Sequence, residues 1–185
     1  MEPYCSAERC RGNTEGRPGI NATTAAYIAG FLDGDGSIHL QLVRQREYRY
    51  GFYVRVSVSF HQHQSGRQGL AWLKTQLGAG YLRDRAGEMS DYVITSRPVI
   101  RDLLVAIAPY TVFKRRQVEE GLRLLDAIEA IDSPEKFLAV ARRVEAFKTL
   151  NRSKRSINTV QTVLDAWLDT GVPAPVTTEP ARVRS

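Results

Sequence analysis

The sequence predicts an α+β domain with the order α-β-β-α-β-β-α and further C-terminal helices around one four-stranded antiparallel sheet. Strand-like alternation occurs in two pairs, and each pair lies between segments with helical periodicity. Of the 185 residues, 43% are hydrophobic, which is enough to bury one core. We place this single domain at 21–170, between a flexible arm at 1–20 and a disordered tail at 171–185 that is rich in Pro and Thr.

The first predicted helix begins at a cap within residues 21–24 and runs to about Asp33. One of its stripes holds only small or short side chains, with Ala26, Gly30 and Asp33 at i, i+4 and i+7. A glycine inside a helix costs roughly 1 kcal/mol relative to alanine, and a close helix–helix approach would offset that cost. We therefore expect Ala26, Gly30 and Asp33 in a dimer interface.

Two predicted hairpins follow the first helix. Alternation over 37–44 and 51–61 indicates the first hairpin, with a basic connection, and the short segments 80–85 and 91–96 indicate the second. A helix at 67–77, which ends at Gly78, joins the two hairpins. Further helices are expected at about 98–108, 114–130 and 134–150, with a last one that includes residues 160–168.

The polar face of the predicted sheet is unusual in composition. An ordinary solvated face carries many Glu and Lys residues, whereas this one holds Arg, Gln, His and hydroxyl groups, which recognise base edges. The net charge of +6 also favours an anionic partner, and Lys accounts for only five of the 26 basic residues, although a GC-rich genome would also favour Arg. The expected DNA contacts on the face are His39, Gln41, Tyr53, Arg55, Ser57, Ser59, His61, Arg83, Arg85 and Asp91, with Arg44, Arg46 and Arg49 on phosphates.

The segment "DGDGS" at 33–37 places two carboxylates at a helix C-terminus, which already carries partial negative charge. A calcium-binding EF-hand loop does not fit, because it would need Gly at Ile38 and Glu at Arg44. A simple turn explains one Asp–Gly step but not the small-residue stripe before it. A divalent cation at Asp35 would account for the pair, and two copies of the helix would bring two such carboxylates together.

The stretch "IAGFLDGDG" at 28–36 resembles the motif of the LAGLIDADG homing endonucleases, and the preceding helix and following hairpin also match that fold. The motif occurs once, which implies the single-motif, homodimeric type. The resemblance implies site-specific cleavage of both strands of a long, pseudo-palindromic DNA target and mobility of the host intron or intein. It also implies Mg²⁺ as cofactor, with Mn²⁺ as a substitute and Ca²⁺ supporting binding without cleavage.

The resemblance assigns roles to individual positions. It implies that Asp35 and the Gly34 carbonyl bind metal, that Gln64 orders the attacking water, and that Lys114 and Arg67 lie near the scissile phosphates. Further DNA contacts implied by the resemblance are Val93, Ser153, Lys154 and Arg155.

Two other functions stay open on the sequence: an RNA-splicing maturase and a DNA-binding regulator with the same fold. A zinc site of Cys5, Cys10, His61 and His63 is disfavoured, because the cysteines lie in a polar arm far from the histidines. No apolar run is long enough for a membrane span, and the N-terminus lacks the apolar core of a secretory signal. We expect an intracellular protein located with the host genome, in a bacterial or archaeal cytoplasm or an organelle, with no membrane partner.

Overall fold

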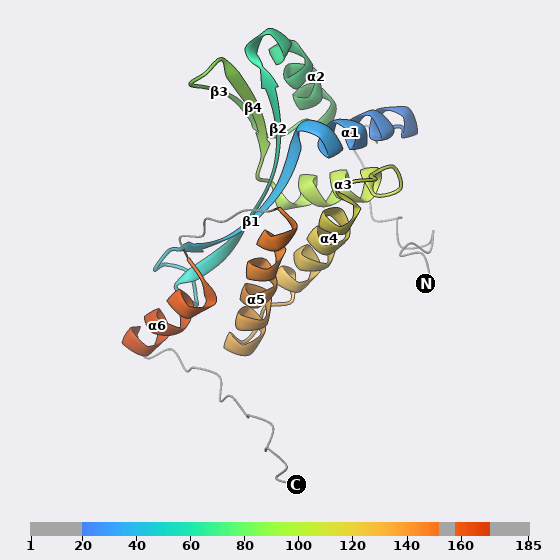
Figure 1. Cartoon of the computed structure of the whole chain (residues 1–185). Coiled ribbons are helices and arrows are strands. Elements are labelled where there is room, and N and C mark those ends of the chain that lie inside the picture. The colour runs from blue at the N-terminus through green and yellow to red at the C-terminus, as the bar shows by residue number, and fades with distance from the viewer. Residues whose placement is uncertain (1–19, 152–157, 171–185) are drawn as a thin grey trace.

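The computed structural model describes residues 20–151 and 158–170 (Figure 1). The helices are α1 (Ala22–Asp35), α2 (Arg67–Leu77), α3 (Arg97–Ile107), α4 (Arg115–Glu129), α5 (Pro134–Leu150) and α6 (Val160–Thr170). The strands are β1 (Gly36–Arg44), β2 (Phe52–His63), β3 (Tyr81–Arg85) and β4 (Met89–Ile94). The predicted arm and tail lie outside these residues apart from Ile20, as do Ser153, Lys154 and Arg155.

The four strands form one antiparallel sheet in the order β1-β2-β4-β3, which confirms the predicted α+β architecture. The first hairpin pairs Gly36 with Phe60 and Arg44 with Phe52. The second half of β2 then pairs with β4, from Val58 opposite Ile94 to His63 opposite Met89. The two hairpins therefore lie side by side, with β2 and β4 at the centre of the sheet.

Local sequence signals set most element ends where they were expected. Asn21 caps α1 by accepting a hydrogen bond from the Thr24 N–H at 2.8 Å. Gly78 ends α2 with a φ of 65°, a left-handed conformation that glycine adopts without a steric penalty. Ser133 caps α5, directly before Pro134 at the first helical position.

Helices cover one face of the sheet and leave the other open (Figure 1). The covered face contributes fully buried side chains such as Val58, Phe60 and Ile94 to the core. These pack with apolar residues of α1, α3, α4 and α5 in one continuous cluster. The alternation of β1 and β2 sends the polar side chains to the open face, as predicted.

Side chains from the C-terminal part of the chain hold the outer edge of the first hairpin. The Asn151 amide donates to the Ile38 carbonyl at 2.6 Å, and the Asn158 amide donates to the Leu42 carbonyl at 2.9 Å. The buried Trp167 indole of α6 donates to the Tyr50 carbonyl at 2.8 Å. Because β1 lies at the edge of the sheet, the two asparagine bonds occupy carbonyls on the side of β1 that has no further strand.

Two of the boundaries that differ from the prediction affect the site. Helix α1 runs to Asp35, where the Gly36 N–H donates to the Leu32 carbonyl, so Asp35 is the last helical residue rather than the residue past the helix. Strand β2 continues to His63, two residues beyond the predicted end, because β4 pairs with it there. In the described parts of the chain, no helix has the length and apolarity to cross a membrane.

Candidate nucleic-acid interface and active site

The open face of the sheet forms a broad polar hollow of about 1030 Å³. It brings together side chains from all four strands, because alternation and the strand register place them on one side. The predicted contacts that line it are His39, Gln41, Tyr53, Arg55, Ser57, Ser59, His61, Arg83, Arg85 and Val93. The hollow is also lined by Tyr48, Tyr81 and Arg97, which were not among the contacts predicted from the sequence.

Asp91 differs from its predicted role as a direct base contact. Its side chain is fully buried at the centre of the face, where its carboxylate accepts from His61 Nδ1 at 2.8 Å and from Arg83 Nε at 2.9 Å. Arg85 approaches it at 3.6 Å. Burial opposes ionisation, but these hydrogen bonds and charges outweigh it and lower the pKa of Asp91 below its usual value. Asp91 therefore orients the side chains around it instead of facing solvent.

The outer end of the face is aromatic and basic. Tyr48 stacks on Tyr53 with ring centroids 4.7 Å apart, and Arg55 donates to the Tyr53 hydroxyl at 2.7 Å. The predicted phosphate contacts Arg44, Arg46 and Arg49 are all exposed here, around the turn of the first hairpin. Tyr48 lies in that turn, so strand periodicity gave no signal for it.

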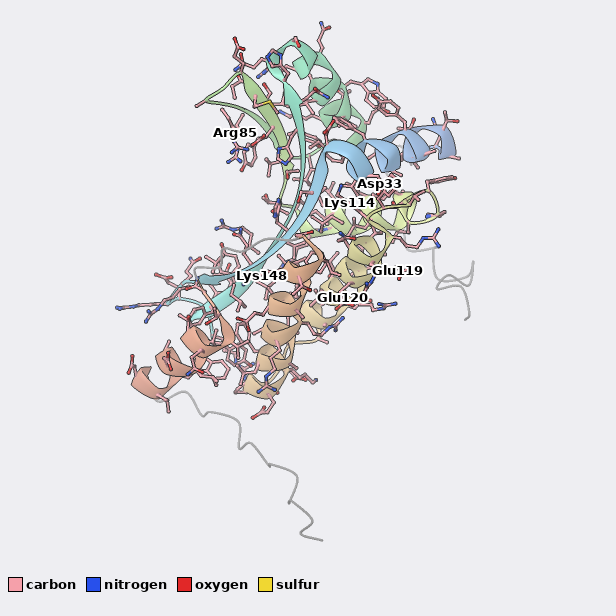
Figure 2. All side chains as sticks on the ribbon, in the orientation of Figure 1. Asp33, Arg85, Lys114, Glu119, Glu120 and Lys148 are labelled. Atoms are coloured by element: carbon pink, nitrogen blue, oxygen red, sulfur yellow. The ribbon has the colours of Figure 1, made fainter. Side chains whose placement is uncertain are left out.

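Asp33 ties the end of α1 to the start of α4. Its carboxylate accepts the backbone N–H groups of Val112 at 2.7 Å, Phe113 at 3.1 Å and Lys114 at 2.8 Å. The Lys114 ammonium donates to the Asp33 carbonyl at 2.6 Å, and Figure 2 shows the two residues side by side. The negative charge at the end of α1 is thus balanced by backbone donors before α4 and by a lysine. The Asp33 carboxylate is engaged within one chain, whereas the sequence analysis expected it in a dimer interface.

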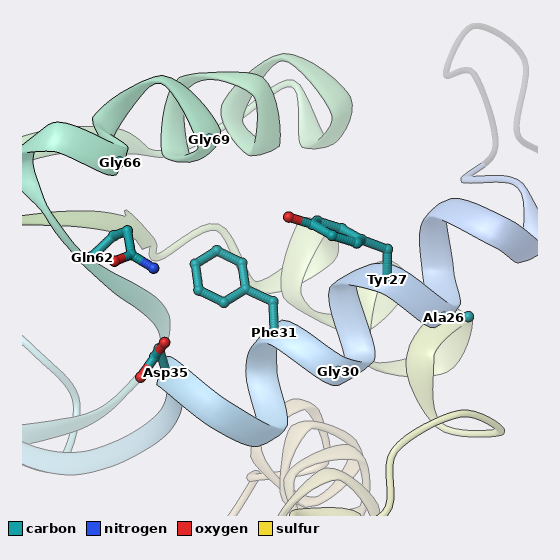
Figure 3. Close-up of a pocket in the computed structure, with 8 residues that line it drawn as sticks. All are labelled: Ala26, Tyr27, Gly30, Phe31, Asp35, Gln62, Gly66 and Gly69. Carbon is teal, nitrogen blue, oxygen red and sulfur yellow. The ribbon is translucent and has the colours of Figure 1, made fainter.

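Asp35 lies at a second, smaller hollow of about 510 Å³ between α1 and α2. Its side chain is exposed, and within the described residues it has no hydrogen bond or ion pair. Gln62 lies across from it (Figure 3); the Gln62 Oε1 accepts from the His63 N–H at 3.1 Å, so the amide NH₂ stays available. The other lining residues are Ala26, Tyr27, Gly30, Phe31, Gly66 and Gly69.

Two residues predicted for the active site, Gln64 and Arg67, lie outside this hollow. Gln64 begins a 3₁₀ turn (Gln64–Gly66) and is exposed outside the hollow, whereas Gln62 lines it. Because β2 runs to His63, Gln62 shares the helix-covered side of the strand with Phe60, whose ring lies 5.4 Å from that of Phe31. Arg67 does not line this hollow, since its Nε pairs with the Asp84 carboxylate at 3.0 Å.

The groups at the end of α1 suit a hard divalent cation. Asp35 offers carboxylate oxygens, and Gly34 is one of the last residues of the helix, whose carbonyls have no partner further along the helix. However, no cluster of three or more His, Cys, Asp or Glu side chains occurs in residues 20–151 and 158–170.

An apolar and small-residue surface borders these groups. Ala26 and Gly30 are exposed on α1, and a Cβ added at Gly30 would meet no atom within 4 Å. Val112 is 69% exposed and Phe113 is 84% exposed, on the segment that the Asp33 carboxylate holds. Large apolar side chains with such exposure are typical of surfaces that contact a partner.

Comparison with known proteins places this arrangement in a family. The family described as LAGLIDADG endonuclease matches residues 28–119, a range that includes Asp35 and the open sheet face. The DNA endonuclease I-CreI of Chlamydomonas reinhardtii is 33% identical over 138 residues, covering 74% of this chain and 84% of the relative. The chain belongs to the LAGLIDADG homing endonuclease family. The DNA endonuclease I-CvuI of Chlorella vulgaris is 27% identical over 130 residues, covering 70% of this chain and 81% of I-CvuI.

Solved structures support the same fold. I-CvuI in complex with its target in the presence of Ca superposes with a TM-score of 0.76 at 24% identity, covering 83% of this chain and 98% of that one. The archaeal intron-encoded endonuclease I-Vdi141I, complexed with DNA, gives a TM-score of 0.71 at 18% identity, covering 82% and 98%. The predicted LAGLIDADG fold with a four-stranded antiparallel sheet and C-terminal helices is therefore confirmed.

Proposed function

We propose that this protein is a site-specific, metal-dependent DNA endonuclease that acts as a homodimer and cuts both strands of a long, pseudo-palindromic target. The observation that carries the proposal is the exposed Asp35 carboxylate, which has no hydrogen bond or ion pair within residues 20–151 and 158–170. It lies at the end of α1, directly before β1 of the sheet whose open face carries base-recognising side chains. The similarity of this chain to DNA endonucleases supports the same activity. By analogy with that family, cleavage would serve the mobility of a host intron or intein.

Asp35 and the Gly34 carbonyl hold the divalent cation in this proposal, with the second subunit and a DNA phosphate completing the ligand set. A bound Mg²⁺ supplies the charge that activates a water and stabilises the leaving oxygen. Mn²⁺ has similar oxygen preferences and is expected to replace it, while Ca²⁺ supports binding without cleavage. The related I-CvuI was solved with its own target in 2 mM Ca, and with the I-CreI target in 2 mM Mg, where the DNA was not cleaved.

Two further side chains act at the same helix end. Lys114 lies 2.6 Å from the Asp33 carbonyl and is placed to offset negative charge on the scissile phosphate. Gln62 takes the role that the sequence analysis gave to Gln64, because its NH₂ group lies across the hollow from Asp35 and can orient a water. Arg67 has no direct role in this proposal, since its side chain pairs with Asp84.

The test is cleavage of a randomised DNA library by the purified protein with Mg²⁺, and with Ca²⁺ as the control. Asp35→Asn is expected to reduce cleavage at the selected site by about a thousandfold, because metal catalysis contributes several kcal/mol. The same variant should bind that site in Ca²⁺ as well as the unmodified protein does. Retained cleavage by Asp35→Asn would show that Asp35 is not a ligand of the metal.

The dimer is tested separately by Gly30→Leu. The open space around Gly30 means that leucine does not disturb the fold of one chain, so any effect arises where a second chain packs. Sedimentation of Gly30→Leu should show a monomer, whereas the control Thr75→Leu, on an exposed position of α2, should sediment like the unmodified protein. An intact Gly30→Leu dimer would place the interface elsewhere.

A maturase or DNA-binding regulator is the alternative function, and it shares the sheet face but needs no metal carboxylate. The exposed Asp35 with Gln62 and Lys114 nearby favours the nuclease. Specific DNA binding in Ca²⁺ without any cleavage in Mg²⁺ or Mn²⁺ would support the alternative.

A further inference from the structure

Three polar side chains on the open sheet face form a continuous hydrogen-bonded row. The Asp91 carboxylate lies 2.8 Å from His61 Nδ1, and His61 Nε2 lies 3.1 Å from the Ser59 Oγ. Ser59 and His61 belong to β2 and Asp91 to β4, in register opposite His61. Both ring nitrogens of His61 are therefore engaged by the protein itself.

The buried end of the row fixes where its protons lie. Asp91 is fully buried, and its hydrogen bonds and neighbouring charges keep it ionised, so its carboxylate is an acceptor only. His61 must then carry a proton on Nδ1, and neutral His61 has a bare Nε2. The Ser59 hydroxyl has to donate to that nitrogen, which leaves only lone pairs on Oγ for any other contact.

Protonation of His61 reverses this polarity without moving a heavy atom. The imidazolium donates from both nitrogens, to Asp91 and to Ser59, so the Ser59 hydroxyl proton is released toward the hollow. The charged groups that face His61 are Asp91 of β4, Arg83 and Arg85 of β3, and His39 of β1.

We propose that Ser59, His61 and Asp91 form a proton-controlled contact for base recognition, which presents a hydrogen-bond acceptor to DNA when His61 is neutral and a donor when His61 is protonated. This inference rests on the proposed function, in which the open face recognises base edges. The neutral row favours the amino groups of cytosine and adenine. The protonated row favours the O6 and N7 acceptors of guanine and the O4 acceptor of thymine.

The row is a contact rather than a second catalytic centre. Ser–His–Asp hydrolases use the same three side chains, but they also need backbone N–H groups aimed at an oxyanion. Ser59 lies in the middle of a central strand, where the sheet ladder uses those groups, and it is 5% exposed. Only a group that reaches the floor of the hollow meets its hydroxyl.

The first test needs no DNA. Nitrogen NMR of the free protein with ¹⁵N-labelled histidine distinguishes the two neutral tautomers, and the chain has three histidines to assign. At about pH 8, above the usual titration range of imidazole, His61 should show the Nδ1–H form. The Nε2–H form would overturn the proposal.

The second test measures base preference with Ca²⁺ present, so that DNA is bound and not cut. Binding to a half-site library at about pH 8 and about pH 5.5 should differ at one symmetric position, where the ratio of amino-bearing to carbonyl-bearing bases falls by about three- to tenfold at the lower pH. His61→Gln keeps a polar side chain that does not titrate, so this variant should lose the shift. His63→Gln, on the same strand but exposed and bonded to Ser65, is the matched control and should keep it.

The outcomes separate the two proposals. DNA binding with the same base preference at both pH values, or a pH shift that persists in His61→Gln, overturns the proton-controlled contact alone. Failure of the unmodified protein to bind any library member at either pH overturns the proposed function and this inference together.

Discussion

Asp91 and Asp35 are two carboxylates of the predicted site, and the chain surrounds them in opposite ways. Asp91 is fully buried and has His61, Arg83 and Arg85 around its carboxylate. Asp35 is exposed at the negative end of a helix, with no hydrogen bond or ion pair in the described ranges. The first carboxylate is satisfied by the folded chain, whereas the second requires a group from outside it. This contrast separates a residue that builds the surface from one that we propose binds the catalytic metal.

The comparison is tested most directly by removing each carboxylate in turn. Asp91→Ala should lower the free energy of unfolding by about 2–3 kcal/mol, because it removes a fully buried carboxylate that accepts hydrogen bonds from His61 and Arg83. Urea denaturation with a chelator present measures this effect. Asp35→Ala is the matched control and should not lose stability. Equal losses in the two variants would mean that Asp35 is also structural.

Asp33 provides an intermediate case, since it is a carboxylate beside Asp35 that the chain does satisfy. Asp33→Asn should cost about 1–2 kcal/mol of unfolding free energy, because one oxygen of the three-donor cap before α4 is replaced by an amide NH₂. The thermal midpoint and urea midpoint should both fall. Unchanged stability would show that the loop at 112–114 keeps its conformation without this charge.

The same contrast should appear in the dependence of the free energy of unfolding on pH. The lowered pKa of Asp91 means that its contribution is fully present above the unfolded-state pKa of about 4 and is lost as pH falls through the lower folded-state pKa. The unfolding free energy of Asp91→Asn should therefore change less between about pH 5 and pH 2 than that of the unmodified protein. Asp84→Asn serves as the exposed control, since the pKa of Asp84 is also lowered, by hydrogen bonds from Ser90 and Arg67. An unaltered acid slope in Asp91→Asn would contradict the assignment.

The smallest expected effect is a gain in the free energy of unfolding rather than a loss. Asp35→Asn removes a negative charge from the C-terminus of α1, where the helix dipole disfavours it, and should raise the unfolding free energy by about 0.5 kcal/mol. Metal-free urea titrations at low salt are the condition in which this gain is largest. A loss of stability instead would indicate that Asp35 has a structural partner.

The sequence predicted the fold well because the signals for it are local. Asn21 and Gly78 set helix ends by their own hydrogen bonding and conformation, and alternation set the two faces of the sheet. The β2 boundary was wrong, because pairing with β4 at Met89 extends the strand beyond its alternating pattern. Because of this extension, the glutamine that lines the hollow beside Asp35 is Gln62, whereas the prediction named Gln64.

The roles within the site depended on contacts that no spacing rule contains. Asp33 reaches backbone groups about 80 residues further along the chain, so its capping role could not be predicted from the motif. Asp91 was correctly placed on the sheet face, but its burial follows from three neighbours on two other strands. Arg67 was expected at the phosphates, and its pairing with Asp84 depends on how α2 crosses β3.

The bonds from the C-terminal part of the chain to the first hairpin also have a consequence for synthesis. Asn151 follows its partner Ile38 by 113 residues, and Trp167 follows Tyr50 by 117 residues. At roughly 5–20 residues per second, the ribosome needs about 6–23 s to make that intervening length. During this interval the edge of β1 has no cover from its own chain. A nascent or prematurely terminated chain would expose a ready template for strand pairing, which makes the last helices the part that protects the first hairpin from aggregation.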